Sequence, residues 1–364
     1  MKYNRTKVDY KEILINITLA DSEAIAAAKI RMDQLVKPLG SLGKLEDISI
    51  KIAGITGKVK NSLVRKCIVI MSADNGIYEE GVSSSPKEIT LLQTINMTKG
   101  VCGIGVLSKA AGSELKIVDI GIDGDYDNEK IVNAKVRWGT DNFAKGPAMR
   151  IEEAEEAINI GISIIGDLYM EGCQLIGTGE MGIGNTSSSS AVIMALTGSS
   201  IEETVGRGGG LSMLDFEKKK RILEAALALN KPDSKNPIDV LYKVGGLDIC
   251  GLVGCFIGAA HYKIPIVVDG VISIAAALCA YRMNENIKDY IFASHISKEP
   301  AFIVAEREIG ISPMLDMNMR LGEGTGCPLA FGIIDLACAV MNNMATFEEV
   351  AIDTKYLVDN RKGK

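Results

Sequence analysis

Five short apolar runs are the feature that most constrains the fold of this chain. Each is mostly apolar and does not alternate strictly with polar residues, which is typical of strands buried on both faces of a parallel sheet. The runs are Cys67–Met71, Leu115–Ile120, Gln174–Ile176, Ile264–Val268 and Tyr290–Phe292. Longer segments of helical pattern separate them, as at residues 87–111, 152–170 and 271–282. This order predicts an α/β fold with a doubly wound, mainly parallel sheet and helices on both faces.

Glycine-rich or polar loops follow the ends of these runs. In open parallel sheets, ligands bind outside the carboxyl ends of the strands, so we expect the loops to surround one site. The segment 177–186 contains four glycines and leads into a helical pattern. Backbone N–H groups at such a helix start can bind an anion, and phosphate is the favoured one. A purely structural turn is the alternative, since Gly-x-Gly-x-x-Gly spacing alone is weak evidence for a dinucleotide.

A second glycine-rich loop, residues 320–326, surrounds one carboxylate, Glu323. Glycines remove side chains from a binding wall and let the backbone approach a ligand closely. A carboxylate held there can act as a general base or accept a ribose hydroxyl, and the alternative is the N-terminal cap of the following helix. The chain has only two histidines, His261 and His295. Acid–base chemistry is therefore expected to use a carboxylate, with His295 as the one alternative.

The composition excludes several classes of protein. The chain has 364 residues and a formal net charge of −6 without a basic block, so we expect no nucleic-acid partner. The longest apolar or glycine run, residues 249–260, is too short to cross a bilayer, and residues 1–10 lack the layout of a signal peptide, so we expect no membrane partner. Eight cysteines without a Cys-x-x-Cys pair favour reduced thiols in a cytoplasmic protein and no metal site.

The ends of the chain have mainly helical patterns and no strong strand pattern. We therefore expect an α/β catalytic domain at residues 60–320. Residues 1–59 and 321–364 are expected to form a small helical subdomain, with the active site between the two parts.

Several of these loops together resemble the family of nicotinate-nucleotide–dimethylbenzimidazole phosphoribosyltransferases. The matching stretches occur in the family's order and span most of the chain. They are residues 37–46 (KPLGSLGKLE), 73–76 with 80–83, 177–186 (GTGEMGIGNT), 205–208, 268–270, 294–297 with 299–300, and 319–326 (MRLGEGTG). One such motif is weak evidence, but seven in order are strong.

The resemblance implies a reaction. The family moves the 5-phosphoribosyl group from nicotinate mononucleotide to an aromatic base, inverts the anomeric carbon and releases nicotinate. The pyridinium leaving group already carries positive charge, so the resemblance implies neither a metal nor a cofactor. The incoming benzimidazole nitrogen carries a proton that must be removed, and the family's base corresponds to Glu323. The family also implies a homodimer.

The resemblance further assigns substrate contacts. They fall on Glu180, Met181, Gly182, Gly184, Lys219, Ser85, Gln93, Leu321, Asp269 and Ser297. Glu180 and the backbone of Met181 and Gly182 correspond to ribose and phosphate contacts, and we expect the backbone of residues 179–184 to bind the phosphate. Lys219 corresponds to a phosphate-binding lysine, but Lys218 and Lys220 are close enough to leave the register open. Ser85 and Gln93 correspond to the pocket for the aromatic base and Leu321 to its apolar wall; a turn serine and a surface glutamine are the alternatives.

The chain departs from the family pattern at several positions. Asn75 stands where the family usually has histidine, and Ser85 stands where an aromatic residue is often found. The first change removes a titratable group, and the second predicts a less aromatic base pocket and a broader choice of acceptor. Two other functions stay open: a phosphoribosyltransferase that uses the diphosphate sugar, and a nucleotide-binding module without turnover. The first would need an acidic pair after a strand, but residues 118–120 and 268–270 each supply one acid.

Overall fold

A seven-stranded sheet forms the centre of the computed structural model, which describes residues 3, 8–208, 210–355, 357–359 and 361. Residues 1–2, 4–7, 356, 360 and 362–364 of the predicted helical subdomain, and Gly209 of the predicted α/β domain, lie outside these residues. All seven strands in the described part of the chain are parallel, in the order β3-β2-β1-β4-β5-β6-β7. In that order they are β3 (Ile131–Asn133), β2 (Glu114–Gly121), β1 (Lys66–Ala73), β4 (Leu175–Met181), β5 (Ile266–Val268), β6 (Ile291–His295) and β7 (Pro313–Leu315). The predicted parallel α/β fold is confirmed.

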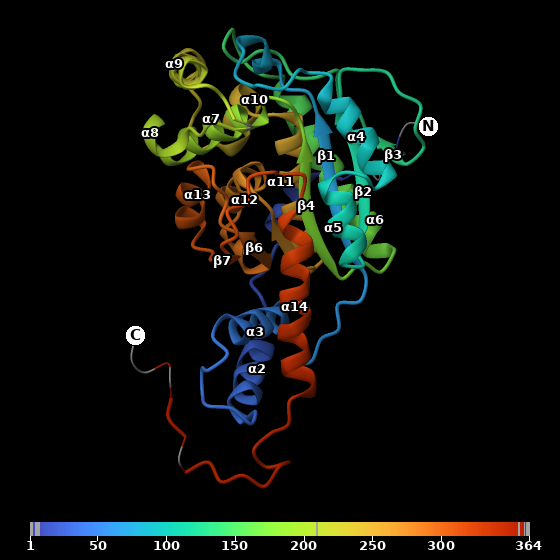
Figure 1. Ribbon diagram of the computed structural model, residues 1–364, viewed down its shortest axis with the longest axis vertical. Coiled ribbons are helices and arrows are strands. Elements are labelled where there is room, and N and C mark those ends of the chain that lie inside the picture. Colours follow the sequence, from blue (N-terminus) through green and yellow to red (C-terminus); the bar gives the residue numbers. More distant parts are fainter. Residues whose placement is uncertain (1–2, 4–7, 209, 356, 360, 362–364) are drawn as a thin grey trace.

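Helices cover both faces of the sheet (Figure 1). One face packs against α4 (Ile89–Lys99), α5 (Gly103–Ala110) and α14 (Gly326–Asn343), and the other against α11 (Leu247–His261) and α12 (Val271–Met283). A further helix, α6 (Ile151–Met170), lies on α11. Glycines allow this close crossing, because a Cβ on Gly161 would lie 2.0 Å from the carbonyl oxygen of Gly251.

The remaining helices lie around the carboxyl ends of the strands or near the chain termini, except for the 3₁₀ helix that leads directly into β6. They are α1 (Tyr10–Ile15), α2 (Ser22–Gln34), α3 (Lys44–Thr56), α7 (Asn185–Thr197), α8 (Ile201–Thr204), α9 (Met213–Asn230), α10 (Pro237–Val244), α13 (Ala301–Ile309), and the 3₁₀ helices η1 (Gly76–Glu80) and η2 (Glu285–Tyr290).

Three details of the expected elements were wrong. β3 and β7 were not anticipated, because three-residue edge strands carry little pattern. The expected helical segment 87–111 divides into α4 and α5 at Gly100, which has φ 70° in the left-handed region. The strand expected to end at Ile176 continues through Gly177 and Gly179 to Met181. Those glycines thus belong to a strand and not to a loop.

The helices near the termini are arranged as follows. Figure 1 shows α2, α3 and the end of α14 extending away from the sheet, and they share a small core that includes Met32, Ala53 and Met341. By contrast, α1 packs on α6 and α11, and the start of α14 packs on β4, β5 and β6. The division of the chain into two domains stays a prediction, and its boundaries at residues 59 and 320 do not follow these contacts.

Among the described residues, α14 is the one helix long and apolar enough to cross a membrane, judged by length and composition. Half of it is buried inside the protein, against the sheet and α3. A helix in a protein core has the same properties.

Candidate active site

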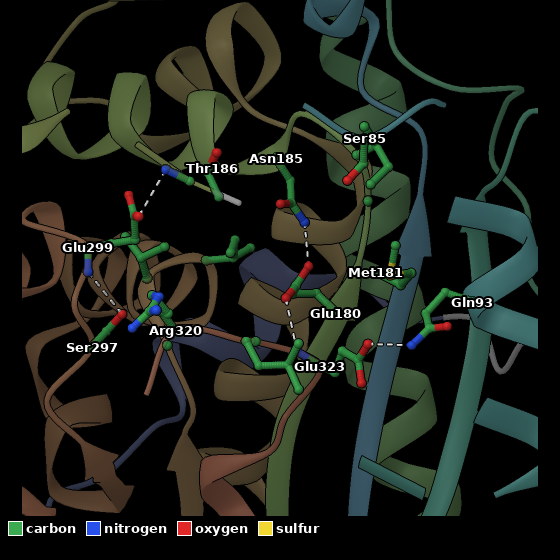
Figure 2. A pocket seen from close by; sticks show the side chains of 18 of the residues that line it. Ser85, Gln93, Glu180, Met181, Asn185, Thr186, Ser297, Glu299, Arg320 and Glu323 are labelled. Atoms are coloured by element: carbon green, nitrogen blue, oxygen red, sulfur yellow. Dashed lines mark hydrogen bonds between the residues drawn. The ribbon is translucent and has the colours of Figure 1, made fainter. Parts of the chain in front are cut away.

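A cavity of about 400 Å³ opens at the carboxyl ends of the central strands. Its volume is in the range of small-molecule sites. Its walls come from residues 180–183, 185 and 186 at the end of β4 and the start of α7, 270–272 after β5, 295, 297 and 299 at the end of β6, and 320–323 before α14, with Ser85, Ile89, Gln93 and Gly208 completing them (Figure 2). In the sheet, β1 lies between β2 and β4. From β1 the chain first adds β2 and β3 on one side of β1, and it then adds β4 to β7 on the other side. The cavity therefore lies at the switch point where open α/β sheets bind ligands.

The loop that carries Glu323 has an unusual backbone. Gly322, Glu323 and Gly324 all have left-handed conformations, with φ of 81°, 61° and 86°. A residue with a side chain is uncommon there and costs on the order of 1 kcal/mol or more. Buried Asp269 holds the loop, because its carboxylate accepts N–H groups from Gly324 at 2.9 Å and Gly326 at 2.7 Å. Burial nevertheless raises the pKa of Asp269 to about 7, against the effect of these hydrogen bonds.

Strand β4 makes room for this loop. A Cβ on Gly179 would lie 2.7 Å from the carbonyl oxygen of Glu323, and one on Gly324 would lie 3.2 Å from the Cα of Gly179. A side chain on either residue would thus push the loop away from the sheet. The glycines of segment 177–179 therefore position the loop over the strand.

The carboxylate of Glu323 is buried and meets donors from two helices. Gln93 in α4 donates to Oε1 at 2.6 Å, and the backbone N–H of Ile104 in the first turn of α5 approaches Oε2 at 3.5 Å. A helix N-terminus favours negative charge. A Cβ on Gly103 would lie 3.4 Å from Oε2 and 2.7 Å from Leu321. The glycine thus lets the helix start approach the carboxylate.

A second carboxylate, Glu180, lies beside Glu323 at the end of β4. Its Oε1 accepts the backbone N–H of Glu323 at 3.3 Å, and its Oε2 accepts the side-chain amide of Asn185. The same amide donates to Asp248 at 2.9 Å, so one asparagine joins two buried carboxylates. Burial raises the pKa of Glu180 to about 8 and that of Asp248 to about 6, and the nearby Asp248 also raises that of Glu180.

Asp248 was not anticipated from the sequence. It is a lone acid in the first turn of the otherwise apolar helix α11, and that position was the available signal. Asn75, which replaces the usual histidine, is buried in the same cluster and accepts a hydrogen bond from Ser188 at 2.8 Å. A Cβ on Gly182 would lie 2.8 Å from Asp248 and 3.0 Å from Asn75. This cluster thus supports the floor of the cavity.

These raised pKa values predict that the folded protein becomes less stable as pH rises, the opposite of the effect of carboxyl groups whose pKa is lowered by folding. A folded carboxyl with a raised pKa binds its proton more tightly than the unfolded chain does, so its stabilisation is lost as pH rises from the ordinary carboxyl range towards 8. We expect the ligand-free protein to lose on the order of 2 kcal/mol between pH 5.5 and 7.5, a few degrees in Tm. Thermal unfolding across this range measures it. Glu180→Gln should reduce the loss, and equal slopes for both proteins would contradict the prediction.

The lysine run lies behind the opposite end of the cavity, next to Thr186. Lys219 is fully buried, and its Nζ donates to Thr186 Oγ1 at 3.1 Å beside the start of α7. Burial lowers the pKa of Lys219 to about 8, opposed by Glu299. Lys218 is exposed, and Lys220 pairs with Glu217 at 3.2 Å. Of the three lysines, Lys219 is the one directed towards the cavity.

Eight of the predicted site residues line the cavity. They are Ser85, Gln93, Glu180, Met181, Gly182, Ser297, Leu321 and Glu323. Gln93 is not a surface glutamine, since it reaches Glu323. Three others lie behind the wall: Gly184 is the N-cap of α7, Lys219 lies behind Thr186, and Asp269 holds the loop of Glu323. Asp269 was placed among the substrate-binding residues without a defined role, and in the structure its carboxylate accepts two N–H groups of the loop that carries Glu323.

The cavity also contains residues that were not among the predicted site residues. They are Ile89, Ile183, Asn185, Thr186, Gly208, Gly270, Val271, Ile272, His295, Glu299, Arg320 and Gly322. Glu299 accepts the N–H of Gly208 at 3.0 Å, and Arg320 lies nearby in Figure 2. Most of these residues belong to the motifs already noted. The motifs therefore indicated the position of the site, but not which of their side chains line it.

Comparison with known proteins agrees with this geometry. A phosphoribosyltransferase family model matches residues 17–352. Two nicotinate-nucleotide–dimethylbenzimidazole phosphoribosyltransferases are close relatives: that of Clostridium perfringens is 50% identical and covers 96% of both chains, and that of Acetivibrio thermocellus is 54% identical and covers 89% of this chain and 92% of its own.

A solved structure also matches. The crystal structure of nicotinate-nucleotide–dimethylbenzimidazole phosphoribosyltransferase from Thermus thermophilus has a TM-score of 0.87 and 36% identity, covering 92% of this chain and 99% of its own. With the parallel sheet and the glycine-framed carboxylate in place, this chain belongs to the nicotinate-nucleotide–dimethylbenzimidazole phosphoribosyltransferase family.

Proposed function

We propose that this protein transfers the 5-phosphoribosyl group from nicotinate mononucleotide to an aromatic base, giving the α-riboside 5-phosphate for the nucleotide loop of a cobamide. The observation that carries the proposal is the buried carboxylate of Glu323, which lies in the cavity between the start of α7 and a partly apolar pocket. A site that only bound phosphate would gain nothing from a carboxylate there.

Different residues along the cavity serve different parts of the two substrates. The start of α7, Thr186 and Lys219 supply donors for the 5-phosphate. Glu180 accepts a ribose hydroxyl or donates to it, since its raised pKa leaves it protonated near neutral pH. Met181, Ile89 and Leu321 form apolar walls for the base beside Gln93.

The chemical step is a displacement at the anomeric carbon. One nitrogen of the base forms a bond to that carbon as the bond to the pyridinium nitrogen breaks, and the breaking bond's electron pair neutralises the pyridinium. Nicotinate leaves without an added proton. The other nitrogen of the attacking azole loses its proton to Glu323, which leaves a neutral base on the sugar.

Nicotinate release tests the reaction. Purified protein is incubated with nicotinate mononucleotide, with and without 5,6-dimethylbenzimidazole and with and without EDTA. Release that depends on the base and is insensitive to EDTA supports the proposal. Release that does not depend on a base, or transfer to the base only from the diphosphate sugar, would contradict it.

The diphosphate-sugar alternative loses support from the positions of its two acids. Asp119 accepts Ile122 N–H and Tyr126 OH, each at 2.8 Å, and lies 3.3 Å from Lys135. Asp269 holds the loop of Glu323. Neither acid is among the residues that line the cavity.

Acceptor choice is expected to be broad. Ser85, Ile89, Gln93 and Met181 line the base side, and the described residues around the cavity include no phenylalanine, tyrosine or tryptophan. Losing one aromatic contact costs on the order of 0.5–1.5 kcal/mol, so the preference for dimethylbenzimidazole should shrink roughly three- to tenfold. Product ratios from competition with benzimidazole, adenine and p-cresol measure it. A preference above a hundredfold would show that the pocket selects its base without an aromatic wall.

We also propose a cytoplasmic homodimer. Exposed apolar side chains on the face formed by α4, α5 and α14, including Leu92, Val106 and Leu336, support a second copy as the partner. All eight cysteines are buried and unpaired, which suits a reducing compartment. Light scattering, recorded as the protein elutes from a size-exclusion column, measures its mass in solution. A monomeric mass at micromolar concentration would refute the dimer.

A further inference from the structure

A second cavity, of about 550 Å³, lies away from the proposed active site. It lies between α3 and the segments around β6 and β7, and includes Ile291 to Ala293 of β6. His295, at the other end of β6, belongs to the first cavity. The two cavities have no lining residue in common. Figure 1 shows α3 beyond the sheet, at the end opposite α7 and α10.

Lysines dominate the charges of this second cavity. Lys29, Lys44, Lys51 and Lys288 line it, against two acids, Asp47 and Asp289. The four lysines form no ion pair with any residue that the structure describes. Asp289 accepts the backbone N–H of Ala20 at 3.1 Å. The cavity therefore has excess positive charge.

Lys51 is the best placed of these cations. Its Nζ donates to the carbonyl oxygens of Ile291 at 2.5 Å and Lys288 at 3.0 Å, which leaves one of its three ammonium hydrogens. Burial lowers the pKa of Lys51 to about 8, and a bound anion would raise it again. Backbone carbonyls hold this ammonium in place but do not neutralise it, and nearby Asp289 opposes the lowering of its pKa without forming an ion pair with it.

Apolar side chains form the surface beside Lys51. The ring of Phe292 lies 4.9 Å from Nζ, and Ile48, Ile311 and Met314 line the same cavity. An anion paired with the ammonium would therefore place an attached ring or short chain against these side chains. Inorganic phosphate would leave the apolar surface uncovered.

We propose that this second cavity binds a small organic anion, whose carboxylate pairs with Lys51 and whose flat apolar body packs on Phe292 and Ile48. Nicotinate released by the proposed reaction and unrelated aromatic carboxylates share this chemistry. The proposal does not depend on turnover at the first cavity.

Ligand-observed fluorine NMR with 4-fluorobenzoate tests the proposal in the full-length protein. Nicotinate mononucleotide is present at saturation to fill the first cavity. We expect saturable binding to one site, with at least tenfold weaker binding of the neutral isostere 4-fluorobenzamide. Inorganic phosphate should fail to displace the probe. Displacement by nicotinate at comparable concentration would identify the product as a ligand, and displacement only by benzoates would identify a different carboxylate.

Variants and a direct contact measurement locate the probe. Lys51→Met should weaken binding of 4-fluorobenzoate at least tenfold, and Lys29→Met, at the rim of the cavity, should weaken it two- to threefold. The control Lys11→Met should leave the binding unchanged.

A contact measurement in wild-type protein does not depend on the folding of Lys51→Met. With labelled isoleucine methyls, nuclear Overhauser effects should link the probe to Ile48 and Ile311. Contacts to Ile89, Ile183 or Ile272 alone, or equal binding of the amide, would overturn the proposal.

Discussion

Replacement of Glu323 with glutamine should lower kcat roughly 10²–10⁴-fold, the range expected for loss of a general base. Glutamine keeps the size and can still face Gln93 and the start of α5, but it cannot take the proton from the attacking base. Binding of nicotinate mononucleotide should change little, because we expect the 5-phosphate to bind at the other end of the cavity, near Thr186 and Lys219. Steady-state kinetics at saturating substrates, with calorimetry for binding, measure both quantities.

A second variant, Gln93→Leu, separates the position of the carboxylate from its basicity. It removes the hydrogen bond at 2.6 Å to Glu323 but leaves the carboxylate itself. It should cost less activity than Glu323→Gln. A loss of less than tenfold for Glu323→Gln would remove this residue from the mechanism. Equal losses for the two variants would indicate that the position of the carboxylate, and not its basicity, limits the rate.

Lys219→Met should weaken nicotinate mononucleotide binding by about 1.5–3 kcal/mol, or roughly 10- to 150-fold. Methionine fills a similar space in this fully buried position but has no charged donor. Because the pKa of Lys219 is lowered to about 8, wild-type affinity should also fall as pH rises above 8, and this fall should be absent from the variant. Calorimetric titrations between pH 7 and 9 measure both effects.

The neighbouring lysines provide matched controls. Lys218→Met and Lys220→Met change an exposed and a partly buried side chain on the same helix, and each should leave the affinity within about twofold. Binding of the free aromatic base should be unchanged in all three variants. Weakening of the base together with the nucleotide would indicate general damage, and a large loss from Lys218→Met would show that another lysine contacts the phosphate.

Much of the fold was predictable because strands and helices leave local patterns. The apolar runs that became β1, β2, β5 and β6 are largely buried on both faces, as parallel strands require. The edge strands β3 and β7 are three residues long and left no such pattern. The extension of β4 through its glycines was also hidden, since glycine is rare in strand interiors and is usually read as a turn.

The sequence by itself determined the fold class, the glycine-framed carboxylate Glu323 and the family, because each depends on residue types at short spacing. Only the tertiary structure decided how residues distant in the chain are placed around that carboxylate and around the rest of the cavity. Asp269 turns its carboxylate to Gly324 and Gly326, Gly179 admits the loop over β4, and Lys219 is buried whereas Lys218 is not. These outcomes depend on hydrogen bonds and close contacts between segments far apart in the chain, and such contacts have no signature in local sequence.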